Sequence, residues 1–384
     1  MLFLILTFDS FYFIISKIQL QIYLYKDTVF TKEKQTKNSA ISGNKLYFCR
    51  ITPLPLAIHK IFFNCMKNIL ITGASGFIGS FLVEEALNRN WKVWAGIRKT
   101  SSKEYLQDER ISFIDLFYSD KEKLKQQIEN HSTSFGKWDY IIHNAGATKC
   151  LNPKDFEKIN CSFTRNLIEA LKEAGAVPDK FILMSSLSAS PPADTVYGKS
   201  KRKAEEFLEA QTDFPYLILR PTGVYGPRDK DYFLMLKSIK NGLELTAGYE
   251  PQILTFIYVK DLAKAAFLAA ESVTEGNIYN VSDGNSYSDE TYTQIAKKAL
   301  GKKRVLKLRV PLIVLKTVSI LAELFSKLSK KPSTLNRDKY KIMKRRDWTC
   351  DSSPITQDLG FQAEYDLKRG IGECVDWYTK QRWL

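Results

Sequence analysis

Short apolar runs alternate with amphipathic stretches along the middle of this 384-residue chain, from residue 69 to about residue 220. The stretches with helical spacing are 120–130, 156–174 and 197–210. The apolar runs that we expect to form strands are 69–71, 91–97, 111–115, 139–143, 180–185 and 216–219. Strands that alternate with helices at this interval predict an α/β fold with a parallel, doubly wound sheet.

The alternation loosens beyond residue 222, and this change divides the chain. We expect a core in residues 66–230, with its sheet completed by parts of 251–284. Residues 231–250 and 285–384 are expected to form a smaller, mostly helical cap that supplies a pocket for a substrate.

Residues 1–65 precede the first predicted strand and form an N-terminal extension. Its beginning is rich in Phe, Ile, Leu and Tyr, but it lacks the basic region and cleavage site of a signal peptide. Its first uncharged run ends at Asp9 and is too short to span a bilayer. Two interpretations stay open: translation begins at Met66, or the extension is a genuine membrane-associating segment.

Three glycines join the first strand to the following helix, within the segment Asn68–Ser80. A sharp turn of this kind gathers bare backbone N–H groups and the positive end of a helix at one point, which suits a diphosphate. Strand, turn and helix all fall where a dinucleotide site requires them. The residues predicted to hold the pyrophosphate are Gly73, Ser75, Gly76, Phe77, Ile78 and Gly79.

The end of the second strand carries Arg98 and Lys99, where a site selective for NAD usually places an acidic residue. A guanidinium at this point suits the 2′-phosphate of NADP and stacks on adenine. We therefore expect NADP to be preferred over NAD. Further cofactor contacts are expected at the ends of the third and fourth strands, from Asp115, Leu116, Asn144, Ala145 and Gly146.

Ser186 ends the fifth strand, and Tyr197 and Lys201 lie four residues apart on the next predicted helix. An ammonium beside a phenol favours the phenolate, and moving a Tyr pKa from about 10 to near 7 requires about 4 kcal/mol. Lys201 and the charge of an oxidised nicotinamide together are expected to supply it. Tyr197 would then exchange a proton with a substrate oxygen that Ser186 orients. Tyr340 and Lys344 have the same spacing but no preceding strand with paired serines, which indicates a surface helix.

The sixth strand ends at Arg220-Pro221 and breaks at Gly226-Pro227. A chain that must leave the sheet here forms a wall beside the nicotinamide. We expect contacts to the cofactor from Pro221, Thr222 and Val224.

These motifs, with Phe256-Ile-Tyr-Val-Lys-Asp261 and Tyr279-Asn-Val-Ser-Asp283, resemble the extended short-chain dehydrogenase/reductase family, also called the epimerase/dehydratase family. The resemblance covers about residues 66–384. It implies a Rossmann-type core with bound NAD(P), hydride transfer at the nicotinamide, and the roles given above for Ser186, Tyr197 and Lys201. It also implies that Asn160 holds a water in the proton path, and that the chain forms a homodimer through the helices at 156–174 and 197–211.

The C-terminal part suggests which branch of the family the chain resembles. Many nucleotide-sugar enzymes carry an Arg just before the Phe-x-Tyr-Val segment, whereas this chain has Gln252-Ile253-Leu254-Thr255. Its apolar, aromatic layout is more similar to the 3β-hydroxysteroid dehydrogenase and dihydroflavonol reductase branches. These imply an oxidoreductase acting on a secondary alcohol or ketone of a hydrophobic molecule. Two alternatives stay open: a nucleotide-sugar epimerase, dehydratase or reductase, and a non-catalytic scaffold that binds the cofactor.

The net charge and the cysteine content limit the classes of binding partner that we expect for this chain. The formal charge is +15, but residues 302–346 alone carry fifteen Lys or Arg and two acids. Because most of the net positive charge is concentrated in this one segment, the sequence argues against a protein that binds nucleic acid. The tract 304–331 is a solvated helical face, an ordinary core-facing helix, a pocket lid or a contact for an anionic membrane, and these alternatives stay open. Six cysteines and three histidines without metal-site spacing predict no metal and a cytoplasmic protein.

Overall fold

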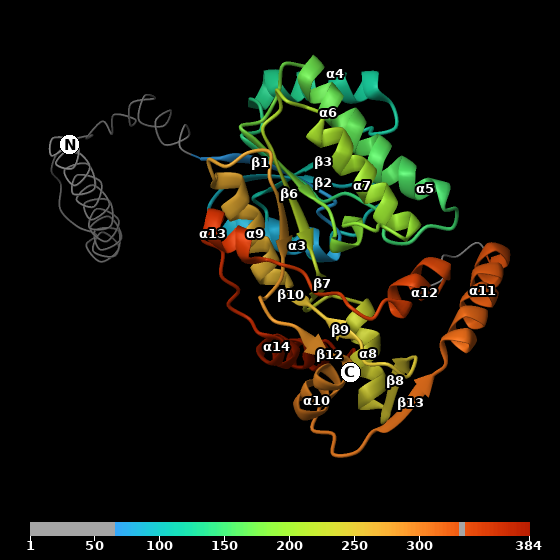
Figure 1. The fold of residues 1–384 in the computed structure, drawn as a ribbon. Helices are drawn as coiled ribbons and strands as arrows, with labels where there is room; N and C mark the ends of the chain where they lie inside the picture. The colour runs from blue at the N-terminus through green and yellow to red at the C-terminus, as the bar shows by residue number, and fades with distance from the viewer. Residues whose placement is uncertain (1–65, 330–334) are drawn as a thin grey trace, which may run out of the picture. The chain divides into compact units, whose positions relative to one another are not determined.

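The computed structural model describes residues 66–329 and 335–384, and the expectations for the extension 1–65 lie outside these residues. Seven parallel strands form the central sheet, in the order β11-β6-β5-β4-β1-β2-β3 (Figure 1). Because the strand order reverses between β1 and β4, the carboxyl ends of these two strands flank the expected ligand crevice. The strands are β1 (Asn68–Thr72), β2 (Lys92–Gly96), β3 (Ile111–Ile114), β4 (Tyr140–His143), β5 (Lys180–Met184), β6 (Tyr216–Pro221) and β11 (Ile278–Val281).

Helices cover both faces of this sheet, as the doubly wound prediction requires. Alternate side chains of β1 point to opposite faces, so that Ile69 and Ile71 join one apolar cluster and Leu70 joins the other. The first cluster includes residues of α3 (Phe77–Asn88), α9 (Val259–Glu271) and α13 (Ser353–Leu359). The second includes residues of α4 (Lys121–Phe135), α6 (Phe163–Glu173) and α7 (Val196–Glu209).

A third apolar cluster joins α8 (Asp231–Lys240), α10 (Asp289–Ala299) and α14 (Leu367–Lys380) to β7 (Gly223–Tyr225) and β10 (Phe256–Tyr258). It is rich in buried tyrosines, among them Tyr225, Tyr258, Tyr292 and Tyr378. Helices predominate in this region, which also contains α11 (Leu312–Ser329) and α12 (Arg337–Lys344). Short strand pairs accompany them: β7 with β10, and β9 (Ile253–Leu254) with β12 (Tyr287–Ser288).

One strand pair of the cap was not expected from the sequence. β8 (Leu243–Ala247) pairs in parallel with β13 (Leu306–Val310). The five residues Leu306–Val310 read Leu-Lys-Leu-Arg-Val, and four of the five side chains are exposed. A pattern of this kind has no buried face to reveal it, so that the pairing depends on a contact between distant segments.

His143 is buried where β4 ends and connects three elements by hydrogen bonds. Its Nδ1 lies 2.9 Å from the Thr72 hydroxyl, and its Nε2 lies 3.0 Å from the Thr164 hydroxyl. Burial lowers the pKa of His143 to about 3, and the nearby Lys201 charge acts in the same direction. His143 is therefore a neutral, structural histidine at physiological pH.

The neutral state of His143 predicts how stability depends on pH. Below about pH 6.5 the unfolded chain binds a proton that the folded chain refuses until about pH 3, so stability falls as pH falls. The contribution is about 1.4 kcal/mol per pH unit in that window. Urea unfolding at pH 7, 6 and 5 should show a shallower decline for His143→Gln than for the unsubstituted protein. Equal slopes in the two proteins would contradict the prediction. The buried His131, whose pKa is lowered to about 4, is retained in both.

Candidate active site

The glycine turn brings the start of α3 unusually close to the end of β1. Gly73 has φ +65°, a left-handed conformation that glycine adopts without strain. A Cβ on Gly79 would collide with the Gly73 carbonyl oxygen, so this approach requires glycine. Gly76 is the N-cap residue of α3, provides no side-chain cap, and is followed by a first turn without acidic residues. The turn therefore presents backbone N–H groups that fit the pyrophosphate of a dinucleotide.

The loops after β2, β3 and β4 are fixed by backbone contacts around this turn. The Ala145 N–H donates to the Thr72 hydroxyl over 2.9 Å. The Asp115 carboxylate accepts from the Lys99 N–H over 3.0 Å, which ties the end of β3 to the loop that carries Arg98. Arg98 itself is exposed. Its predicted contact with a cofactor phosphate stays a prediction.

Four of the predicted segments follow adjacent strands. Because β1, β4, β5 and β6 are neighbours in the sheet, their carboxyl ends bring the glycine turn, Ala145, Ser186 and Thr222 into one row. Arg98 and Asp115 follow β2 and β3, on the other side of β1. The residues predicted to act in catalysis thus lie on one side of β1, and those predicted to contact adenosine lie on the other.

Lys201 is buried and held in a fixed position. It lies on α7, one turn after Tyr197, and its ammonium donates to the Met184 carbonyl oxygen over 2.8 Å. Burial lowers the pKa of Lys201 to about 8, against the opposing charge of Glu205. This side chain can therefore change its charge near physiological pH.

Tyr197 and Ser186 meet at the amino end of α7. Burial raises the pKa of the Tyr197 phenol, and a hydrogen bond with Ser186 opposes that rise. Ser186 is extended and its hydroxyl also accepts from the Ser188 N–H over 3.2 Å. In the protein alone Tyr197 is thus a neutral phenol. The effect of Lys201 on its pKa stays a prediction for the cofactor-bound protein.

Asn160 lies in a π-helical turn, Lys158–Ser162, which connects α5 (Lys154–Glu157) to α6. Its amide bonds both backbone groups of Ala147, at 2.7 and 3.0 Å. A Cβ on Gly146 would lie 3.0 Å from the Asn160 Oδ1 and 3.1 Å from the Lys201 Nζ. Asn160 and Lys201 therefore converge on one glycine. π-helical turns of this kind are frequent at functional sites.

Two further residues at the site were missed by the sequence analysis. Glu205, fully buried on α7, accepts from the Ser185 hydroxyl and from two nitrogens of Arg220. Asp338 on α12 accepts from the N–H groups of Val196 and Tyr197, at 2.8 and 3.2 Å. The position of Glu205, four residues after Lys201 on a predicted helix, was a sequence signal that could have identified it. For Asp338 the sequence offered no signal, except that it is one of two acidic residues in the basic segment 302–346.

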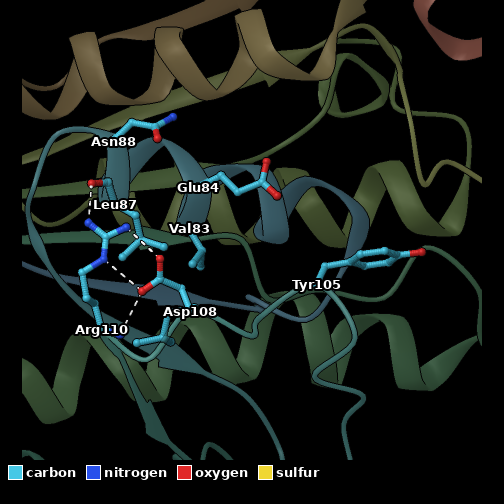
Figure 2. Close-up of a pocket in the computed structure, with 8 residues that line it drawn as sticks. Val83, Glu84, Leu87, Asn88, Tyr105, Asp108 and Arg110 are labelled. Carbon is cyan, nitrogen blue, oxygen red and sulfur yellow. Dashed lines mark hydrogen bonds and ion pairs between the residues drawn. The ribbon is translucent and has the colours of Figure 1, made fainter. Parts of the chain in front are cut away.

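A surface pocket lies between α3 and the segment that leads into β3 (Figure 2). In it the Arg110 guanidinium binds the Asp108 carboxylate at 2.7 and 2.9 Å and donates to the Leu87 carbonyl oxygen. The lining residues are Val83, Glu84, Leu87, Asn88, Tyr105, Asp108, Arg110 and Ile111. This set shares no residue with the predicted site.

Two further findings concern metal binding and membrane-spanning helices. Within residues 66–329 and 335–384, no group of His, Cys, Asp and Glu side chains is arranged to bind a metal. Among the described helices, none combines the length and the apolar character that a membrane span requires.

The family model of the NAD-dependent epimerase/dehydratase family matches residues 69–282, which contain the glycine turn and the Ser186, Tyr197 and Lys201 set. The chain belongs to this family. The family resemblance drawn from the sequence motifs is thereby confirmed, as are the Rossmann-type fold and the enzyme class.

Individual relatives differ in what their names say they act on. The chain is 27% identical over 320 residues to a ceramide reductase of Caulobacter vibrioides, covering 82% of this chain and 96% of that protein. It is 22% identical over 336 residues to a decarboxylating sterol-4-alpha-carboxylate 3-dehydrogenase of Dictyostelium discoideum, covering 80% of this chain and all of that protein.

The fold also matches solved structures. One is UDP-glucose 4-epimerase of Thermotoga maritima with UDP-glucose, at a TM-score of 0.64 and 20% identity, covering 82% of this chain and 99% of that one. This likeness concerns the fold alone.

The close approach of α3 to β1 predicts a specific sensitivity to an added methyl group. Gly79→Ala should destabilise the protein by about 1–3 kcal/mol, because the Cβ collides with backbone, and should abolish stabilisation by NADP. Gly372→Ala on α14 is the matched control, since its Cβ would meet no atom within 4 Å. That variant should be neutral or more stable by about 0.5–1 kcal/mol. Urea unfolding and thermal shifts with NADP measure both. Equal behaviour of the two variants would disprove the argument.

Proposed function

We propose that this chain is an NADP-preferring oxidoreductase that interconverts a secondary alcohol and a ketone on a lipid-like molecule. The observation that carries the proposal is the set of side chains at the carboxyl end of β5 and the amino end of α7, where the buried Lys201 is fixed by Met184 and Tyr197 meets Ser186. Family membership supports the cofactor. The preference for NADP and the substrate class are the parts that the proposal adds.

The residues have distinct roles in this reaction. A nicotinamide cofactor held at the glycine turn would supply the hydride chemistry at the substrate carbon, in either direction. Ser186 donates a hydrogen bond to the substrate oxygen and orients it. Tyr197 gives its phenolic proton to that oxygen during reduction and takes one back during oxidation. Asn160 and Lys201 converge beside Gly146, and in this proposal they hold a water that returns the proton.

A lipid-like substrate is supported by the relatives and by the segment before β10. Relatives named for ceramide and for sterol-4-carboxylate act on hydrophobic molecules. In this chain the Gln252 amide donates to the Arg345 carbonyl oxygen over 2.6 Å, and the Thr255 hydroxyl donates to the Trp348 carbonyl oxygen over 2.8 Å. Both side chains therefore bind the chain's own backbone, at the position where many nucleotide-sugar enzymes carry an arginine.

A nucleotide-sugar epimerase is the second candidate, because the same Ser186, Tyr197 and Lys201 set serves a transient hydride transfer and the fold matches such an enzyme. The two functions differ in stoichiometry. An oxidoreductase consumes one cofactor for each product, whereas an epimerase returns it unchanged. For either function we propose a homodimer through α6 and α7.

Replacing the proposed acid/base residue gives the direct test of function. Tyr197→Phe should lower kcat by about 10²- to 10⁴-fold, because the proton donor is lost. Tyr340→Phe is the matched control, since Tyr340 has the same spacing to a lysine but lies on α12, which has no buried residue. We would follow NADPH oxidation with ceramide-type ketones, 3-ketosterols and UDP-glucose. Conversion of UDP-glucose without net NADPH loss would favour the epimerase, and full activity of Tyr197→Phe would favour a non-catalytic scaffold.

Cofactor preference is expected to depend on Arg98. Arg98→Asp should weaken NADP binding roughly 10- to 100-fold, because the charged partner of the 2′-phosphate is replaced by a repelling one. Binding of NAD should be unchanged or tighter. Thermal-shift titrations with both cofactors measure this, with Arg304→Asp as a charge-matched control far from the glycine turn in sequence. If the unsubstituted protein is stabilised more strongly by NAD than by NADP, the preference is refuted.

A further inference from the structure

Helix α11 turns an apolar stripe toward solvent. At 100° per residue the exposed apolar positions of this helix cover an arc of about 140°. Each of these side chains is at least 45% exposed: Ile313, Val314, Val318, Leu321 and Leu324. The opposite side of the helix carries the buried Leu315 and Ser319. The helix is thus packed on one side and leaves an apolar surface uncovered on the other.

The strand pair that precedes α11 continues this apolar character. Partner residues in a parallel pair lie on the same face, so the register places Leu306, Leu308 and Leu245 together. All three are at least 50% exposed. The other face carries an ion pair between Lys307 and Glu244. β13 leads directly into α11, and both lie at the edge of the cap (Figure 1). We call these three leucines and the α11 stripe the apolar face.

An excess of basic residues flanks the apolar face along the chain. Residues 302–346 carry a net charge of +13, and Lys302, Lys303, Arg304 and Lys316 are exposed. Of the two acids in this range, Asp338 is engaged by the backbone of α7. A second copy of the chain would bring a like charge to the same surface, which opposes self-association through it. An occupant must therefore offer both apolar volume and negative charge.

We propose that the apolar face docks on the surface of an anionic lipid bilayer. An amphipathic element binds in the interfacial plane when its apolar side enters the acyl boundary and its basic side chains meet anionic headgroups. The leucines, isoleucine and valines of the apolar face form the side that enters the acyl boundary. The flanking lysines and Arg304 are the basic side chains that meet the headgroups. This inference stands on the surface itself and holds whichever substrate the active site accepts.

Co-sedimentation of the full chain with vesicles tests the proposal without turnover. The protein should bind vesicles made of equal parts phosphatidylglycerol and phosphatidylcholine, and bind vesicles of phosphatidylcholine alone at least tenfold more weakly. Added salt should weaken the binding. Binding that is equal for the two compositions, or absent from both, would overturn the proposal.

Substitutions then locate the contact. Val318→Glu/Leu321→Glu should weaken vesicle binding at least tenfold, whereas Val273→Glu, at a side chain that is 98% exposed outside the apolar face, should not. Lys302→Gln/Lys303→Gln/Arg304→Gln should remove much of the salt dependence, with Lys123→Gln/Lys125→Gln as the control. All replaced groups are solvent-facing, and unchanged melting temperatures confirm folding. Binding by the first variant as tight as that of the unsubstituted chain would overturn the proposal. So would a dimer that only this variant dissociates, since a second copy would then cover the face.

Discussion

The buried carboxylate of Glu205 connects the elements on which the catalytic geometry depends. It is fully buried, yet it accepts hydrogen bonds from the ends of two strands: the Ser185 hydroxyl after β5, and Arg220 Nε and Nη2 on β6, at 2.9 and 2.6 Å. A two-point contact between guanidinium and carboxylate fixes orientation as well as distance. Arg202 adds a third donor, with its Nη1 at 3.3 Å from the Glu205 carboxylate.

This anchor also fixes the residues that neighbour it in the chain. Ser186, the proposed substrate-orienting residue, follows directly after Ser185. Lys201 lies one helical turn before Glu205, whose negative charge partly offsets the cost of burying the ammonium. The net effect still lowers the pKa of Lys201 to about 8. The site therefore holds a neutral phenol beside a lysine of adjustable charge, and a positively charged nicotinamide would act on both.

Local patterns were sufficient to predict much of this from the sequence. The strands, the glycine turn and the placement of Tyr197 and Lys201 on one helix depend on residues close together in the chain, where spacing and residue type carry the information. The β8–β13 pair, the role of Glu205 and the exposed side of α11 were not predicted, because each depends on which distant segment packs against it. Periodicity shows that α11 is amphipathic, but not which of its sides meets protein.

Asp338 joins the basic segment, residues 302–346, to helix α7. Its hydrogen-bond partner Val196 lies 142 residues away in the sequence. Its carboxylate caps the N–H groups of Val196 and Tyr197, at the positive end of the α7 dipole, and Lys341 donates to the Asp194 carbonyl oxygen. Because α12 follows α11, the element proposed to meet the bilayer is connected through α12 to the residue proposed to transfer the proton.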